Sequence, residues 1–284
     1  MAQFILSAFA DEADRMLTGQ IDALKQNGIS LIELRGVNGK SVADLTDVEA
    51  DEVRARLDDN GIKLSALGSP YGKYPIDQPF GPHRDAFRRG LELARRLGTA
   101  RMRMFSFYLP EDNKDLSAWR GKVVDQIGAM LDDAADASVL LCHENERGIY
   151  GESDTGCVDL YETFKGRLGC VYDPANYIVS GYDPFAAFEK VEKYITYMHI
   201  KDAVMATRAI VPTGKGDGRI GEILRRVASR TDDVILTVEP HLTVFDGLKD
   251  LQRETLKHEF VYPTPRAAFD AAVSALKETL APIA

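Results

Sequence analysis

The chain has 284 residues, of which 45% are hydrophobic and 28% charged, and these proportions are ordinary for a globular protein. Its 35 basic and 44 acidic residues give a net charge of −9, which argues against a nucleic acid partner, and no uncharged apolar run is long enough to span a membrane. Three cysteines do not make a disulfide framework, and the first ten residues lack the features of a signal peptide, so we expect a cytoplasmic protein.

Short apolar runs alternate with amphipathic segments along the chain. The first four runs, at residues 4–9, 31–34, 62–67 and 101–105, are predicted to be strands. Apolar residues at helical spacing mark the helices between and after them: Leu17, Ile21 and Leu24; Phe87, Leu91 and Ala94, ending at Gly98; Val123, Ile127, Met130 and Ala134; and Phe269, Val273, Leu276 and Leu280.

Four further apolar runs each end in a residue that can bind a metal ion. These residues are Glu144, Asp173, His199 and Glu239, and they are separated by 29, 26 and 40 residues. Each interval has room for about one strand and one helix. A charged group at the end of a core strand needs a partner or a metal ion to offset the cost of leaving water.

Eight strands that alternate with helices predict a (β/α)₈ TIM barrel, which we expect to form a single domain over residues 1–284. A doubly wound open sheet is the alternative. In a barrel the carboxyl ends of all strands meet at one rim, so the four residues would converge there. Three carboxylates and one imidazole make an oxygen-rich site suited to a divalent cation. The longest irregular stretch, residues 242–265, follows the eighth strand, and we expect it to be a lid or substrate loop.

Several segments resemble one known family. The segments His-Glu-Asn at 143–145, Asp-Pro at 173–174, His-Ile-Lys-Asp at 199–202 and Glu-Pro-His at 239–241 resemble the sugar phosphate isomerase/epimerase family of xylose-isomerase-like TIM barrels. Segments 9–12, 32–36, 69–73 and 103–106 are also similar, so the resemblance covers essentially the whole chain. It implies that Glu144, Asp173, His199 and Glu239 bind one divalent ion, manganese, cobalt, magnesium or zinc.

The chain departs from this family at two positions. Characterised ketose epimerases often have a histidine two residues after the first metal-binding glutamate, where this chain has Glu146. They often have a substrate-contacting histidine three residues after the metal-binding aspartate, where this chain has Asn176. Both differences concern the substrate, and they affect the predicted fold and metal site less.

Other polar residues are candidates for contacting substrate, although ion pairs with neighbours or exposure to solvent would also explain them. Glu33 and Lys73 lie at or just beyond the ends of N-terminal strands, and His241 is two residues past Glu239. The full set of candidates is Glu33, Lys73, Asn176, Lys201, Asp202, Arg208 and His241. The segment Gly-Lys-Gly-Asp-Gly at 214–218 resembles a phosphate cradle, but a plain turn is the simpler interpretation.

These residues suggest a divalent-metal-dependent isomerase or epimerase that acts on a sugar, a polyol ketone or a sugar phosphate. A divalent ion would acidify the C–H beside a carbonyl group. Glu144 and Glu239 would then act as base and acid on opposite faces of the enediolate, and Glu146 is the alternative candidate for this role. The resemblance supports this pair, because related epimerases use the same metal-binding glutamates as acid and base.

Three other functions are open. The same barrel and metal could dehydrate a keto-polyol or keto-acid. An AP-endonuclease-like phosphodiesterase fits less well, because its three-zinc cluster is rich in histidine and this chain has five histidines. The third is a non-catalytic carbohydrate-binding barrel. The expected partners are small molecules, with neither nucleic acid nor membrane, and the barrel could also form a homo-oligomer.

Overall fold

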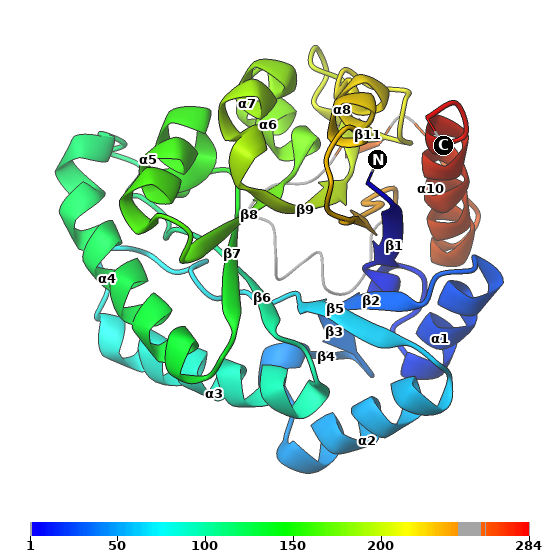
Figure 1. Cartoon of the computed structure of the whole chain (residues 1–284), viewed down its shortest axis with the longest axis horizontal. Helices are drawn as coiled ribbons and strands as arrows, with labels where there is room; N and C mark the ends of the chain where they lie inside the picture. Colours follow the sequence, from blue (N-terminus) through cyan, green and yellow to red (C-terminus); the bar gives the residue numbers. More distant parts are fainter. Residues whose placement is uncertain (1, 244–256, 259, 284) are drawn as a thin grey trace.

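The computed structural model describes residues 2–243, 257–258 and 260–283. Eight parallel strands form a nearly closed barrel, and the helices lie outside it (Figure 1). The order of pairing is β1-β12-β9-β8-β7-β6-β5-β2, and the end strands β1 and β2 lie next to each other. The structure therefore confirms the predicted single-domain TIM barrel and excludes the open doubly wound sheet.

The first four barrel strands agree with the predicted runs to within one residue at each end, and the other four end within one residue of Glu144, Asp173, His199 and Glu239. They are β1 Phe4–Ala8, β2 Leu31–Leu34, β5 Lys63–Leu67, β6 Arg101–Met104, β7 Leu140–Glu144, β8 Leu168–Tyr172, β9 Ile195–Ile200 and β12 Val234–Val238. Short additional strands are β3 Gly36–Val37, β4 Lys40–Ser41, β10 Asp202–Ala203, β11 Ala209–Val211 and β13 Lys257–His258.

The helices cover the outside of the barrel with their apolar faces turned toward the strands. They are α1 Leu17–Gln26, α2 Asp47–Asp59, α3 Phe80–Leu97, α4 Leu116–Asp136, α5 Asp154–Phe164, α6 Pro174–Ser180, α7 Pro184–Val191, α8 Ile220–Val227 and α10 Pro265–Leu280. The apolar residues that predicted helices at α1, α3, α4 and α10 are buried, except Leu280. Gly98 ends α3 in the left-handed conformation that glycine favours at this position.

Helix α2 lies between the second and third barrel strands, where no helix is predicted from the sequence. A capping box begins this helix: the Thr46 side chain accepts from the Glu49 amide, and the Glu49 side chain accepts from the Thr46 amide. The Thr-x-x-Glu pattern could have predicted the start of α2. Its apolar face is narrow, with only Ala50, Val53 and Leu57 buried, which is why the periodicity is weak.

Inside the barrel, side chains from alternate strand positions fill the space below the carboxyl-terminal rim. A small apolar cluster is formed by Ala66, Cys142, Val171 and Tyr197. All three cysteines are buried and free. Of the predicted lid at 242–265, residues 244–256 and 259 lie outside the described residues. Among the described helices, none has the length and apolar character that a bilayer crossing needs.

Candidate metal centre

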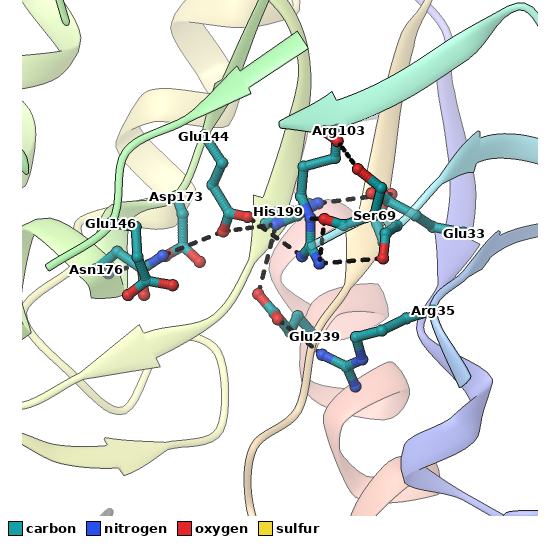
Figure 2. Close-up of polar contacts among 12 residues, drawn as sticks. Glu33, Arg35, Ser69, Arg103, Glu144, Glu146, Asp173, Asn176, His199 and Glu239 are labelled. Atoms are coloured by element: carbon teal, nitrogen blue, oxygen red, sulfur yellow. Dashed lines mark hydrogen bonds and ion pairs between the residues drawn. The ribbon is translucent and has the colours of Figure 1, made fainter. Parts of the chain in front are cut away.

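Four consecutive barrel strands deliver Glu144, Asp173, His199 and Glu239 to one point at the carboxyl-terminal rim (Figure 2). Glu144 ends β7, His199 lies near the end of β9, and the other two directly follow β8 and β12. One ligand atom from each of the four lies within 4.8 Å of those of the others. All four side chains are buried. The sequence therefore identified residues that the fold does bring together.

The Glu144 carboxylate has a separate partner on each oxygen. Its Oε1 accepts from Asn176 Nδ2 at 3.1 Å and lies 3.0 Å from His199 Nδ1. Its Oε2 accepts from Arg103 Nη1 at 3.2 Å. The Arg103 guanidinium is buried between the rings of Phe9 and Phe105. Arginine and imidazole thus fix the direction in which this carboxylate points.

Glu239 is held in a similar way by two other cations. Its Oε1 accepts from Arg35 Nη1 at 3.1 Å, and its Oε2 accepts from Lys201 Nζ at 3.0 Å. Lys201 Nζ also lies 2.9 Å from Asp173 Oδ2. Each of the two glutamates is therefore paired with its own buried arginine, one from β6 and one from the end of β2 (Figure 2).

Glu33 lies behind the His199 imidazole, on the side away from Glu144. Its Oε2 is 3.1 Å from His199 Nε2 and also accepts from the Thr237 hydroxyl, while its Oε1 accepts from the Tyr197 hydroxyl. When neutral, His199 would donate its Nε2–H to this carboxylate and keep the Nδ1 lone pair for a metal ion. Glu33 is fully buried and does not line the cavity, so its placement does not support the expected contact with substrate.

The protonation of the cluster is set by burial and by these pairs. Burial alone would raise the pKa of Glu144, but a protonated His199 and Arg103 outweigh it and bring this pKa down to about 2. Against burial, Glu144 and Glu33 in turn hold the pKa of His199 well above its usual value, so a metal ion that binds here displaces this proton. Burial likewise opposes ionisation of Glu239, yet Lys201 and its other neighbours hold its pKa well below the usual range. Burial raises the pKa of Asp173 to about 7, with Lys201 opposing the shift. Glu144 and Glu239 are thus held as carboxylates, the form that a metal ion needs.

The residues fit a divalent cation. Three carboxylates and one imidazole form a donor set that is common for such ions. Asp173 Oδ2 is buried and accepts no aligned hydrogen bond, although Lys201 lies at ion-pair distance. A buried carboxylate oxygen without a hydrogen bond is costly unless another cation takes it. A second metal-capable group, Glu12, Glu239 and His241, shares Glu239 with the first and belongs to the same site.

A cavity of about 10 Å³, roughly the room for one water molecule, lies beside this cluster. It is lined by Lys73, Arg103, Glu144, Glu146, Asn176, Lys201, Glu239 and His241. Four of the seven predicted substrate contacts are in this lining. One of them, His241, has a backbone φ of 45°, in the left-handed region, and its amide donates to Glu12 Oε2 at 2.6 Å. Such strain outside glycine is typical of functional sites.

Asp202 and Arg208 do not line the cavity. The Asp202 carboxylate accepts from the amides of Gly214, Gly216 and Gly218, so Asp202 does not pair with Lys201. The Arg208 guanidinium donates to the backbone carbonyl groups of Ile178 and Val179. Each side chain is thus used to hold a loop, and this placement does not support the predicted contacts with substrate.

Arg35 and Arg103, which are not among the predicted site residues, lie against the two glutamates. Arg103 lies between Met102 and Met104 in β6, and Arg35 directly follows Leu34 at the end of β2. An arginine inside or at the end of a buried strand requires a buried carboxylate partner. That pattern is a signal from which a role for both could have been predicted.

An eight-stranded barrel with a carboxylate and imidazole cluster at its carboxyl-terminal rim defines a class of TIM barrels whose rim could hold a metal ion. Within it, a sequence profile of the xylose isomerase-like TIM barrel family matches residues 21–258. The chain belongs to this family. No curated protein sequence matches the chain.

Solved structures of similar fold cover nearly the whole chain. An L-ribulose 3-epimerase has a TM-score of 0.75 at 16% identity and covers 100% of this chain and 96% of its own. The probable 3-DHS dehydratase AsbF of Bacillus anthracis has a TM-score of 0.72 at 14% identity, covering 98% and 99%. A xylose isomerase-like protein from Mycobacterium smegmatis, in complex with magnesium, has a TM-score of 0.67 at 15% identity, covering 99% and 97%. At these identities the similarity establishes the fold alone.

Proposed function

We propose that this protein is a divalent-metal-dependent isomerase or epimerase that acts on a sugar, a polyol ketone or a sugar phosphate. The observation that supports the proposal is the convergence of Glu144, Asp173, His199 and Glu239 to within 4.8 Å beside a polar cavity. Epimerases are among the solved structures that share the fold. A function of this kind needs the metal ligands and the proton-transfer groups at one place.

Manganese, cobalt, magnesium or zinc bound by these four residues would supply a Lewis acid that polarises a carbonyl group of the substrate. Glu144 and Glu239 come from strands on different sides of His199, and both line the cavity. We assign them the removal and the return of the proton on the two faces of the substrate. Arg103 and Lys201 also line the cavity, where their positive charges would stabilise an oxyanion that develops on the substrate.

Dehydration of a keto-polyol or keto-acid is the second candidate. It needs a further group that gives a proton to the departing hydroxyl, and the Lys73–Glu146 pair lies in the cavity lining outside the metal cluster. A probable dehydratase also shares the fold. A phosphodiesterase with three zinc ions is less well supported, because the metal-capable groups among the described residues contain only two histidines, His199 and His241. A non-catalytic carbohydrate-binding barrel would not need the complete ligand set.

Solvent deuterium exchange tests the proposal. The metal-loaded protein is incubated in heavy water with ketoses, inosose-type polyols and their phosphates, and each is analysed by mass spectrometry. We expect metal-dependent deuterium incorporation beside the carbonyl of at least one compound. An unsaturated product would favour dehydration. Absence of exchange from all compounds, by protein shown to hold its ion, would contradict the proposal.

A further inference from the structure

The loop after β9 is the first place to look for a phosphate site, since TIM barrels often bind phosphate with the loops after their seventh and eighth strands. Here β9 is the seventh barrel strand, and the glycine-rich segment 214–218 follows it. The amides of Gly214, Gly216 and Gly218 all point at the Asp202 carboxylate, at 2.9, 3.1 and 2.9 Å. The protein's own carboxylate thus fills the cradle that a phosphate would use.

The glycines bring the loop close to this carboxylate. A Cβ atom on Gly216 would lie 2.5 Å from Asp202 Oδ1, and one on Gly218 would lie 2.6 Å from it. The amide of Ala203 donates to the same oxygen at 2.9 Å. Asp202 therefore uses the amide donors of this loop, and a phosphate group could bind there only by displacing a buried charge.

The positively charged residues that line the cavity are also matched by carboxylates. Arg103 pairs with Glu144 at 3.2 Å, and Lys201 pairs with Glu239 at 3.0 Å. The third cation, Lys73, pairs with Glu146 at 2.7 Å. Among the described lining residues, each cation therefore faces an anion.

Lys73 and Glu146 form the outer part of the lining. Their side chains are 10% and 23% exposed, whereas the other charged residues of the lining are at most 5% exposed. Lys73 is presented by a fixed loop: the Gly72 amide donates to His83 Nε2 at 3.0 Å, and the Lys73 ammonium lies 4.4 Å from the centre of the Phe105 ring. The end of a substrate that is farthest from the metal cluster would meet this pair.

We propose that Glu146 is a specificity-determining residue that makes the site select unphosphorylated substrates. A hydroxyl group can accept a hydrogen bond from Lys73 and donate one to Glu146, so the pair suits a polyol chain. A phosphate group would form an ion pair with Lys73 but would also lie against the Glu146 carboxylate. Contact between two like charges is strongly unfavourable. The inference rests on the proposed function, and it narrows the substrate class to sugars or polyol ketones without a phosphate group.

Inorganic phosphate is the probe that tests this directly. Its affinity for the magnesium-loaded protein is measured by ³¹P NMR titration of the wild type, Glu146→Gln and Glu146→Ala. Any coordination of phosphate by the magnesium ion is common to the wild type and the variants. The difference in phosphate affinity between them therefore reports the charge at position 146. We expect both substitutions to raise phosphate affinity by about tenfold or more. The double variant Lys73→Met/Glu146→Gln should lose the gain, because the gain depends on the positive charge of Lys73.

Glu162→Gln is the matched control, since Glu162 also pairs with a lysine, Lys193 at 2.9 Å, but lies on α5 away from the cavity. It should leave phosphate affinity unchanged. The proposal is overturned if the Glu146 variants bind phosphate no better than the wild type, or if the gain survives in the double variant. The titration measures binding and requires no turnover. Absence of deuterium exchange would therefore contradict the proposed function without affecting the phosphate-binding result.

Discussion

The Glu33 carboxylate lies directly behind the His199 imidazole, with Oε2 of the glutamate 3.1 Å from Nε2 of the histidine. Glu33 comes from β2 and His199 from β9, 166 residues apart in the chain. The contact orients the ring so that Nδ1 faces the carboxylates of the cluster. In the proposed metal centre, the role of Glu33 is therefore to position His199.

Replacing Glu33 with glutamine should therefore weaken metal binding. The side-chain amide would turn an NH₂ group toward one of three donors, Tyr197, Thr237 or His199, and the ring would lose its fixed direction. We expect the affinity for Mn²⁺ to fall about 10- to 100-fold, as for other groups that support a ligand. Equilibrium dialysis measures this. An unchanged affinity together with a raised KM would instead return Glu33 to contact with substrate.

The two glutamates of the proposed metal centre should differ in the epimer from which each removes a proton. Glutamine at position 144 or 239 keeps an oxygen for coordination but cannot act as a base. If each carboxylate serves one face, each variant should lose deuterium exchange from one epimer and keep partial exchange from the other. Equal loss from both epimers in variants that hold metal would argue against the assignment. Near-normal turnover would make Glu146 or Lys201 the better candidate.

The loop that presents Lys73 should depend on glycine at position 72. Gly72 has a φ of 90°, and a Cβ atom there would lie 1.9 Å from the backbone oxygen of Phe105. Alanine should therefore cost about 3 kcal/mol or more of unfolding free energy, since neither backbone segment can move alone. Gly61 is the control, with a φ of 68° but nothing within 4 Å. Its alanine variant should cost about 1 kcal/mol. Equal costs in urea unfolding would show that the clash relaxes.

His83 should make the protein less stable in mild acid. Burial lowers the pKa of His83 from 6.5 to about 4, and its Nε2 must stay unprotonated to accept from the Gly72 amide. The unfolded chain therefore takes up this proton first as the pH falls. The contribution is fully present above a pH of about 6.5 and is lost progressively toward the folded pKa.

At pH 5 the loss should be about 1–2 kcal/mol relative to pH 7. Glutamine at position 83 keeps an acceptor for Gly72 but does not titrate in this range. The difference in unfolding free energy between pH 7 and pH 5 should therefore be smaller in His83→Gln by this amount. A variant with the same pH dependence as the wild type would assign the acid sensitivity to other groups.

The strand ends could be predicted from sequence because an apolar run that stops at a carboxylate or imidazole is a local pattern. The contacts across the barrel are not local. Arg35 and Glu239 are 204 residues apart, and their pairing depends on how the strands close around the interior. The burial of Glu33 has a similar cause, since it is the third residue of a four-residue strand and lies deeper than the rim.

The different roles of Lys201 and Asp202 follow from the alternation of side chains along an extended chain. Adjacent residues of an extended chain point to opposite sides. The Lys201 side chain therefore points to the same side as His199, into the site, while the Asp202 side chain points toward the glycine-rich loop. Arg208 has no such signal, because it lies in a turn whose partners come from the end of α6.

The most direct test of the metal centre uses two aspartates that both cap helices. The Asp173 side chain accepts from the Asn176 amide at the start of α6, and the Asp183 side chain accepts from the Phe185 and Ala186 amides at the start of α7. Asparagine at either position can keep the cap, but at position 173 its NH₂ group would replace the oxygen that faces Lys201, so urea unfolding first establishes that each variant is folded. Only Asp173→Asn removes a charged ligand. We predict one Mn²⁺ per chain by equilibrium dialysis in the wild type and in Asp183→Asn, and an affinity reduced at least about 100-fold in Asp173→Asn. Equal Mn²⁺ binding by all three proteins would contradict a metal site built from Glu144, Asp173, His199 and Glu239.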